Sequence, residues 1–175
     1  GKLIGSTSID LPKSMFPPDV SFIPDDDSLT FVKWFGSTLK NKDFEVKVWP
    51  DRGENAVYKS GEKVVFYFRA DRDCYVYLYH KDAAGNIQQL FPNSFTRNNF
   101  IVAPYGQEIV KAVASLQPVV VAEFISASKD EVFRNIGRIG TADGEQNIRS
   151  VVRAIELVPK TGRAESLTAI TTIEK

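Results

Sequence analysis

The sequence has one cysteine, Cys74, and one histidine, His80. A single thiol excludes an intramolecular disulfide and a multi-thiolate zinc site, and a single imidazole excludes most zinc and Ser-His chemistries. The 22 Lys and Arg residues balance the 22 Asp and Glu residues, which gives a formal net charge of zero. Because no Lys- or Arg-rich run offsets this neutrality, the chain has no bulk attraction for phosphate backbones, and we expect no nucleic-acid partner.

No apolar stretch approaches the roughly 20 residues that span a bilayer, so we expect no membrane span in this chain. The sequence begins with Gly1, as a trimmed or processed chain would, and a signal or lipid anchor before Gly1 stays an open alternative. With 175 residues, of which 43% are hydrophobic, the chain can fill one sizeable core. We therefore predict a single domain over residues 44–175, with residues 1–43 as an N-terminal extension packed on it.

Alternating apolar and polar residues predict antiparallel strands over much of the chain. The stretch from Phe44 to Val48 alternates clearly and is ended by Pro50, while Cys74 to His80 has apolar bodies on both faces and is predicted to be a central strand. Gly85 is expected to take a positive φ in the hairpin turn that follows. Further strands are predicted at residues 63–69, 87–91, 100–102, 108–114, 118–125 and 167–173.

The apolar period changes to that of a helix after residue 127. The residues from Ser128 to Glu131 have the spelling of a capping box and predict a short helix that ends near Gly140. Asp143 is expected to cap a second helix, although Ala154 to Val158 could instead form a strand. The predicted fold class is therefore all-β: an antiparallel β-sandwich, immunoglobulin-like in general architecture, with a small helical C-terminal insertion at about residues 129–157.

Short motifs occur in a fixed order between Phe44 and Ser115. They are Val48 to Pro50, Val57 to Glu62, Cys74 to Tyr79, Asp82 to Gly85, Leu90 to Asn93, and Gly106 to Ile109 leading to Ala112 and Ser115. In order and spacing they resemble the bacterial domain-of-unknown-function family number 4384. The sequence departs from that family between Asn98 and Gly106, where relatives tend to carry a longer loop and strand, so this member is shortened or a loop is missing near Val102 to Pro104.

The resemblance implies a β-sandwich-like module, usually in exported or envelope proteins and sometimes appended to other domains. It implies no established catalytic residues. We therefore expect an extracytoplasmic location, either periplasmic or at the cell surface, and the resemblance supplies no chemistry.

Three tyrosines that alternate along one strand, Tyr75, Tyr77 and Tyr79, are the candidate ligand-binding residues. A row of phenolic rings offers flat apolar area and hydroxyl groups, which suit sugar rings or peptide. The alternative, which the frequency of Tyr in strands favours, is that this face is core, covered by the N-terminal patch or the C-terminal helices.

The N-terminal patch is the candidate interaction surface, and its large apolar residues are Phe31, Trp34 and Phe35. We expect it to dock on the body of the domain. If it were exposed instead, it would mark a structural module that completes a larger protein or associates with a second copy.

Cys74 and His80 cannot act together as nucleophile and base, because they lie about 20 Å apart along an extended strand. We expect Cys74 to be a small buried apolar residue and His80 to be a solvated turn residue. Glu62 and Glu108 could serve as the acid and base of a hydrolase, but nothing in the sequence brings them together.

Acidic residues at positions 25–27 and the pair Asp71 and Asp73 complete no calcium-loop spelling, and we expect solvated loop charges and no metal site there.

The function expected from these patterns is that of a non-catalytic exported bacterial module that binds or scaffolds at the cell envelope. A protein or a cell-wall glycan is the expected partner, and no cofactor is expected. A purely structural or oligomerisation domain of a larger protein is the alternative, and a carbohydrate-active hydrolase is a more distant third. The pattern fixes neither the ligand nor the oligomeric state.

Overall fold

The computed structural model describes residues 33–92, 99–100, 102–120 and 134–175 of the chain. Its strands are β1 Val46–Pro50, β2 Val57–Lys59, β3 Lys63–Val64, β4 Phe66–Ala70, β5 Tyr75–Lys81, β6 Asn86–Phe91, β7 Asn99–Phe100, β8 Gln107–Ser115, β9 Arg134–Arg138 and β10 Arg163–Ile173. Helix α2 spans Ala142–Glu156, the short 3-10 helix η3 spans Lys160–Gly162, and a helical turn covers residues 33–36. The prediction of a chain made mostly of β-sheet is confirmed.

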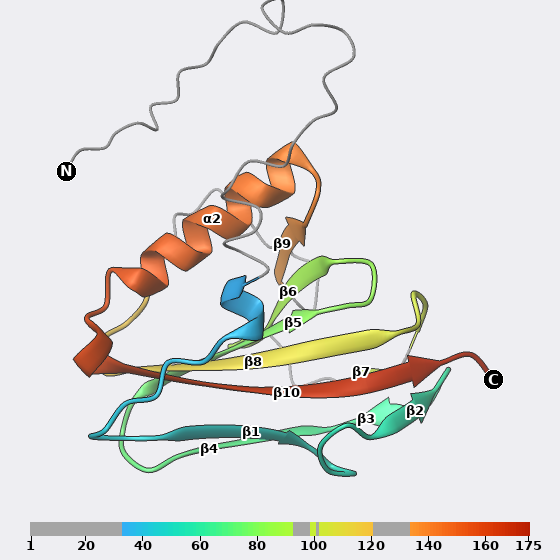
Figure 1. Ribbon diagram of the computed structural model, residues 1–175, viewed down its shortest axis with the longest axis horizontal. Helices are drawn as coiled ribbons and strands as arrows, with labels where there is room; N and C mark the ends of the chain where they lie inside the picture. Colours follow the sequence, from blue (N-terminus) through green and yellow to red (C-terminus); the bar gives the residue numbers. More distant parts are fainter. Residues whose placement is uncertain (1–32, 93–98, 101, 121–133) are drawn as a thin grey trace, which may run out of the picture.

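A six-stranded sheet in the order β2-β10-β8-β5-β6-β9 forms the centre of the described structure. Strands β5, β8 and β10 pair antiparallel over most of their length, whereas β2 joins the edge of β10 in parallel. Strand β5 lies between β8 and β6, as its apolar residues on both faces predict. Among the described strands there are also two short antiparallel pairs, β1-β4 (Figure 1) and β3-β7.

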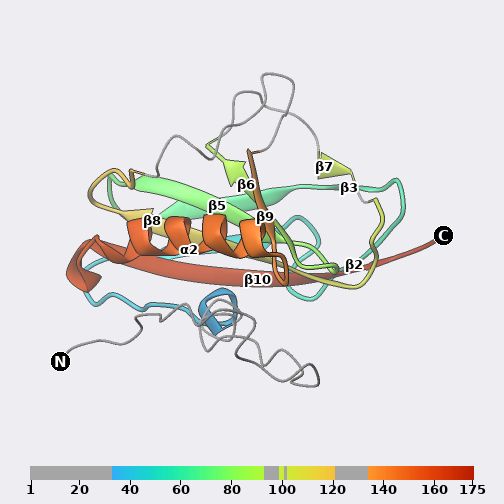
Figure 2. The same ribbon diagram turned by 90° about the horizontal axis from the view of Figure 1, so that it is seen from above.

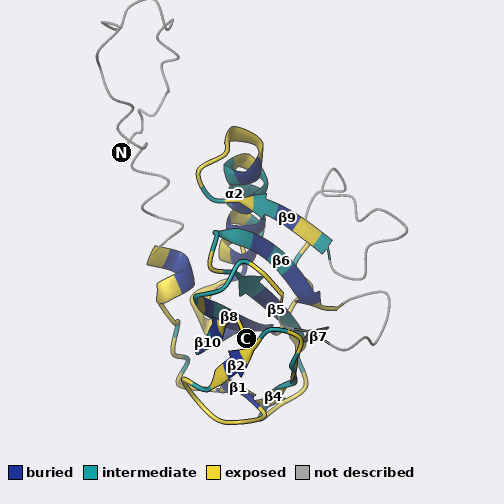
Figure 3. Cartoon of the chain, turned by 90° about the vertical axis from the view of Figure 1, so that its right-hand side faces the viewer, coloured by how far each residue is buried: buried dark blue, intermediate teal, exposed yellow. Residues whose placement is uncertain are grey.

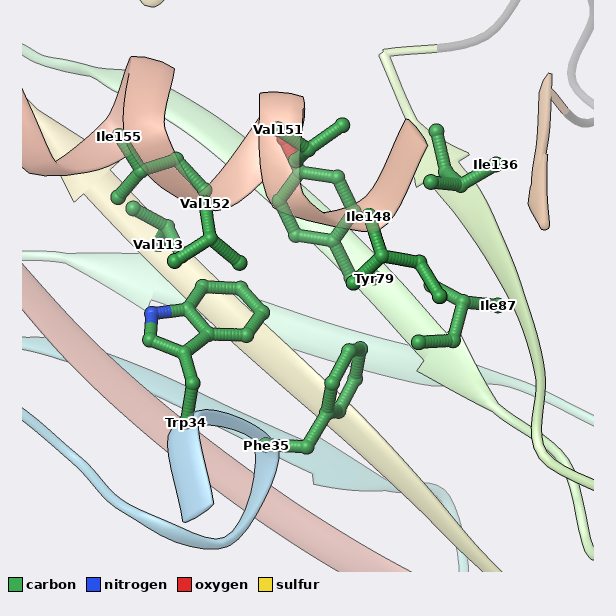
Figure 4. Packing of buried hydrophobic residues seen from close by; sticks show 10 residues of the cluster. All are labelled: Trp34, Phe35, Tyr79, Ile87, Val113, Ile136, Ile148, Val151, Val152 and Ile155. Atoms are coloured by element: carbon green, nitrogen blue, oxygen red, sulfur yellow. The ribbon is translucent and has the colours of Figure 1, made fainter. Parts of the chain in front are cut away.

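The two faces of the central sheet are covered differently. On one face the β1-β4 pair encloses a core that includes Val48, Leu78 and Ala112. On the other face α2 lies over the strands (Figure 2), and Trp34, Tyr79 and other buried side chains fill the space beneath it (Figure 4). Because side chains alternate along β5, Leu78 belongs to the first core and Tyr79 to the second.

Helix α2 packs through an apolar stripe at helical spacing, and the buried members of that stripe are Ile148, Val151, Val152 and Ile155. The alternative of a strand from Ala154 is excluded, because α2 continues to Glu156. The N-cap is Thr141 rather than the expected Asp143, and the carboxylate of Glu145 accepts the backbone N–H of Gly140 instead. None of the helices among the described residues combines the length and the apolar content that a membrane span requires.

The short helix predicted to end near Gly140 is wrong where the structure describes it, because residues 134–138 form strand β9. This strand pairs antiparallel with β6, from Asn86 opposite Arg138 to Gln89 opposite Arg134. Pairing satisfies the backbone groups along the free edge of β6 and buries Ile136 under α2. The stabilisation from these two effects outweighs the local preference for a helix that the apolar spacing indicates. The capping-box residues themselves lie outside the described residues.

Two further local predictions have different outcomes. Gly85 has φ of +84° in the β5-β6 hairpin, so the predicted positive angle is confirmed. The strand predicted at residues 118–125 is not formed at 118–120, and the rest of that range lies outside the described residues.

Candidate functional site

The three predicted tyrosines do not form one open row of rings. Tyr75 is 50% exposed, Tyr77 is partly buried, and Tyr79 is 1% exposed. The hydroxyl of Tyr77 accepts the backbone N–H of Val119 at 2.9 Å, and the ring of Tyr79 lies edge-on to Trp34 with centroids 6.1 Å apart. Tyr79 is therefore a core residue, and Tyr75 alone keeps a largely open ring.

The described part of the N-terminal patch is docked on the domain. Trp34 and Phe35 are buried in the core beneath α2, with their rings edge-on at 5.1 Å between centroids. Phe31 lies outside the described residues. Because Trp34 and Phe35 are buried in the core, they offer no exposed apolar surface to a partner. These two residues therefore do not form the predicted interaction surface.

His80 is not the solvated turn residue expected from the sequence. It lies within β5, where its Nε2 is 2.6 Å from Oε2 of Glu108 on β8. The other carboxylate oxygen, Oε1, accepts a hydrogen bond from Oγ1 of the buried Thr172 on β10. The Glu108 carboxylate thus lies between the Thr172 hydroxyl and the His80 imidazole. A hydroxyl nucleophile needs the imidazole directly beside it, so this order is not that of a catalytic triad. These three residues therefore form a polar link between strands.

Glu62 and Glu108 belong to separate interactions. Glu62 accepts hydrogen bonds from the guanidinium of Arg52 at 2.9 Å and from the backbone N–H of Lys59 at 2.8 Å. These hydrogen bonds, first from Arg52 and then from Lys59, lower the pKa of the Glu62 carboxyl. Glu62 is therefore held as an ionised carboxylate in a turn, while Glu108 is engaged with His80.

Cys74 and Asp71 also have structural roles in the fold. Cys74 packs, partly buried, against the core under β1-β4, and burial raises the pKa of its thiol. The thiol is thus kept protonated, as the prediction of a small apolar residue requires. Asp71 accepts the backbone N–H of Glu45 through Oδ1.

A surface that the sequence analysis did not single out lies on the outer face of the β1-β4 pair. Strand β1 alternates buried and exposed residues, so Val46 and Val48 face the core while Lys47 and Trp49 face outward. Trp49 pairs with Tyr67 of β4, and the two rings have centroids 6.0 Å apart and planes 26° from parallel. Their exposed fractions are 38% and 49%. Trp49 and Tyr67 thus form a stacked aromatic pair that is partly exposed to solvent.

The next rung of the same face is cationic. Lys47 lies directly opposite Arg69, and both side chains are exposed. Lys47 has a 3.5 Å ion pair with Glu45 in which both side chains are 65% exposed, and Arg69 has no ion pair or hydrogen bond within the described ranges. We call Trp49, Tyr67, Lys47 and Arg69 together the β1-β4 outer face.

An open groove adjoins this face. It has a volume of about 740 Å³ and lies between β1, the segment 38–45 that leads into it, and the first half of β10. Lys47, Trp49 and Glu54 line one part of the groove, and Ser166 and Leu167 of β10 line another. Exposed residues border the β1-β4 pair on the side away from α2 (Figure 3). The outer face and the groove therefore form one continuous accessible region around Trp49.

A signal for this site was present in the sequence. Trp49 continues the polar side of the alternation that begins at Glu45 and Lys47, and a Trp on the polar side of a half-buried strand has to lie on the surface. The pairing of Trp49 with Tyr67 depends on the register between β1 and β4, which the alternation alone does not give.

The fold and the site together define a mostly β-sheet protein with an exposed aromatic and cationic sheet face. The sequence profile of the family described as Domain of unknown function (DUF4384) matches residues 57–103. The family resemblance predicted from the motifs is confirmed over this part, which contains Tyr67 and Arg69. No curated protein matches the chain, and no solved structure matches it.

Proposed function

We propose that this chain is a non-catalytic module that binds a ligand at the bacterial cell envelope through the β1-β4 outer face. The observation that carries the proposal is the exposed Trp49-Tyr67 pair. Two large rings that remain exposed to water forgo the stabilisation that burial gives, about 25 cal/mol per Å² of apolar surface. Aromatic rings beside cationic side chains are typical of recognition surfaces, where each ring supplies apolar area at low conformational cost.

The non-catalytic part of the proposal is supported by how the reactive side chains are engaged. His80 is paired with Glu108, which also accepts a hydrogen bond from Thr172, while Lys111 is paired with Glu165 and Glu62 with Arg52. Each of these groups is therefore already engaged by a partner in the fold, and Glu165, whose carboxylate is paired with Lys111, is the one of them that also lines the groove beside Trp49. A ligand can bind at the β1-β4 outer face and the adjoining groove while all of these pairs stay intact.

The envelope location and the immunoglobulin-like architecture are parts of the same proposal. The location is supported by the family resemblance, and fractionation of bacteria that express the native full-length gene product tests it. The sandwich is supported by the β1-β4 pair that packs over one face of the larger sheet. An experimentally solved structure tests the immunoglobulin-like topology.

The binding test compares two exposed aromatic residues on different faces. The purified chain is mixed with peptidoglycan sacculi, acidic and neutral glycans, and extended peptides, and retention is measured for wild type, Trp49→Ala and Tyr75→Ala. Tyr75 is the matched control, because it is exposed but belongs to the face of β5 on the α2 side. We expect Trp49→Ala to abolish retention and Tyr75→Ala to retain it, with both melting temperatures close to wild type.

Three results would overturn the proposal. Turnover of any glycan by the wild-type chain would make it a hydrolase. Loss of retention in Tyr75→Ala with Trp49→Ala unaffected would move binding to the predicted tyrosines. Concentration-dependent association that Trp49→Ala abolishes, without retention on any ligand, would support the oligomerisation alternative.

A further inference from the structure

Building on the proposed function, we propose that the β1-β4 outer face binds an acidic glycan. A neutral sugar ring stacks on the Trp49-Tyr67 pair, and the carboxylate of the adjacent sugar lies between Lys47 and Arg69.

The cationic rung is the first reason for a negatively charged ligand. Like charges directly opposite each other on adjacent strands destabilise a sheet, and Lys47 and Arg69 occupy such positions. The ion pair of Lys47 with Glu45 is exposed and long at 3.5 Å, so it offsets little of that repulsion. An anion placed between the two cations relieves it. The planar guanidinium of Arg69 can donate two parallel hydrogen bonds to one carboxylate.

The aromatic rung is the reason for a sugar. Flat rings that carry a hydroxyl or an indole N–H suit the apolar face and the polar rim of a pyranose. Trp49 and Lys47 are two residues apart on one face, which places the rungs about 7 Å apart along the strand. This separation is comparable to the step from one sugar to the next in an extended glycan, so adjacent sugars reach adjacent rungs.

The acidic residues at the end of the strands disfavour a continuous polyanion. Glu45 and Asp71 lie two positions beyond Lys47 and Arg69, past the Val46-Ala70 pair. The backbone N–H of Glu45 donates to Oδ1 of Asp71, and the backbone N–H of Asp71 donates to the carbonyl of Glu45. A nucleic acid laid along the strands would meet two carboxylates next to the two cations, although aromatic rings and cations alone would suit a single strand. A glycan in which neutral and acidic sugars alternate places one negative charge at the cations and none at the carboxylates.

The test uses a hyaluronan hexasaccharide, in which N-acetylglucosamine alternates with glucuronate, measured by calorimetry or amide chemical shifts. Its carboxyl-reduced form, a chitin hexasaccharide and single-stranded oligo-dT are the comparison ligands. We expect hyaluronan to bind at least tenfold more tightly than its reduced form. Arg69→Gln and Lys47→Gln should each bind hyaluronan about tenfold more weakly than wild type, yet bind the reduced form as wild type does. Trp49→Ala should lose its affinity for both ligands. Arg153→Gln on α2 is the charge-matched control and should bind as wild type does.

The outcomes separate this inference from the proposed function. Equal affinity for chitin and hyaluronan overturns the acidic-glycan inference and leaves a glycan-binding module. Tighter binding of oligo-dT also overturns it, as does an Arg153→Gln loss equal to that of Arg69→Gln, which would indicate bulk charge alone. If the chain binds none of these ligands and no sacculus or peptide, the proposed function fails as well.

Discussion

The Nζ atom of Lys111 on β8 lies 2.8 Å from Oε2 of Glu165 on β10, and both side chains are buried. Lys111 also donates hydrogen bonds to the carbonyls of Trp34 and Ser37, and its ammonium lies 4.2 Å from the centre of the Trp34 ring. The backbone N–H of Leu39 donates a hydrogen bond to Oε2 of Glu165, and the backbone N–H of Glu165 donates one to the carbonyl of Leu39. Burial lowers the pKa of Lys111, although Glu165 opposes that shift. The pair thus joins the central sheet to the segment that leads into β1 and borders the groove.

Loss of Lys111 should be strongly destabilising. In Lys111→Met the carboxylate of Glu165 stays buried, and its remaining ionic partner in the described structure is Arg163, at 3.9 Å. Breaking a buried pair in this way costs about 3–5 kcal/mol, because one charge is left without its counter-charge. Urea denaturation measures the change. The double variant Lys111→Met/Glu165→Leu should recover most of the loss, and a single-variant loss below about 1 kcal/mol would contradict this account.

Tyr58 should make stability fall at alkaline pH. Its hydroxyl is 2.8 Å from Oδ1 of Asp51, to which it donates. Burial, and then this hydrogen bond, raises the pKa of Tyr58 to about 12. Because the folded pKa lies above the unfolded value of about 10, the folded state holds the proton that the unfolded state has lost. The stabilising effect is complete below pH about 10 and is lost as pH rises through about 12.

The measurement is denaturant unfolding of wild type and Tyr58→Phe from pH 8 to 12. The difference in unfolding free energy between the two proteins should shrink above pH 10, since phenylalanine does not titrate. A difference that stays constant over this range would show that the Tyr58 proton is not linked to folding.

Tyr77 and Tyr79 lie on the same face of β5 but should respond differently to loss of the hydroxyl. Tyr77→Phe removes the hydrogen bond that Val119 donates and should cost about 1 kcal/mol. The buried hydroxyl of Tyr79 has no hydrogen-bond partner in the described structure, so Tyr79→Phe should be neutral or stabilising. Thermal unfolding of the two variants decides this, and an equal loss in both would mean that the Tyr79 hydroxyl has a partner.

The parts of the fold that the sequence predicted are those set by local alternation. Strand β5 and the burial of one face of β1 follow from side chains that alternate within a single strand. The sequence predicts a helix where β9 forms, because the spacing of Ile136 from Ile139 suits a helix and the edge of β6 that β9 completes is distant in the sequence. The helical period predicts α2 correctly, and its stripe of four buried residues prevails over the strand that Ala154 to Val158 also allow.

The site was harder to predict for the same reason. The sequence predicts a turn for His80 because its partner Glu108 lies 28 residues further along the chain. Thr172, which donates to Glu108, lies another 64 residues beyond it. The Trp49-Tyr67 pair likewise requires the register of two strands. The alternation of apolar and polar residues within a strand shows which side chains are exposed. The register between paired strands determines which residues lie beside them.

Arg69 should favour binding at the expense of stability. Arg69→Glu replaces the like-charge rung with an opposite-charge pair across from Lys47 and should stabilise the chain by about 0.2–1 kcal/mol. The same variant removes a cation from the β1-β4 outer face, so its affinity for the hyaluronan hexasaccharide should fall below that of Arg69→Gln. Urea denaturation and calorimetry on the same protein preparation measure the two effects.

The double variant Lys47→Glu/Arg69→Glu is the control for this prediction. It restores a like-charge rung, now negative, so its stability should drop below that of Arg69→Glu while binding stays lost. If Arg69→Glu were less stable than wild type, Lys47 and Arg69 would not repel each other in the folded chain. The physical reason for an anion between them would then be removed, and with it the main support for an acidic ligand.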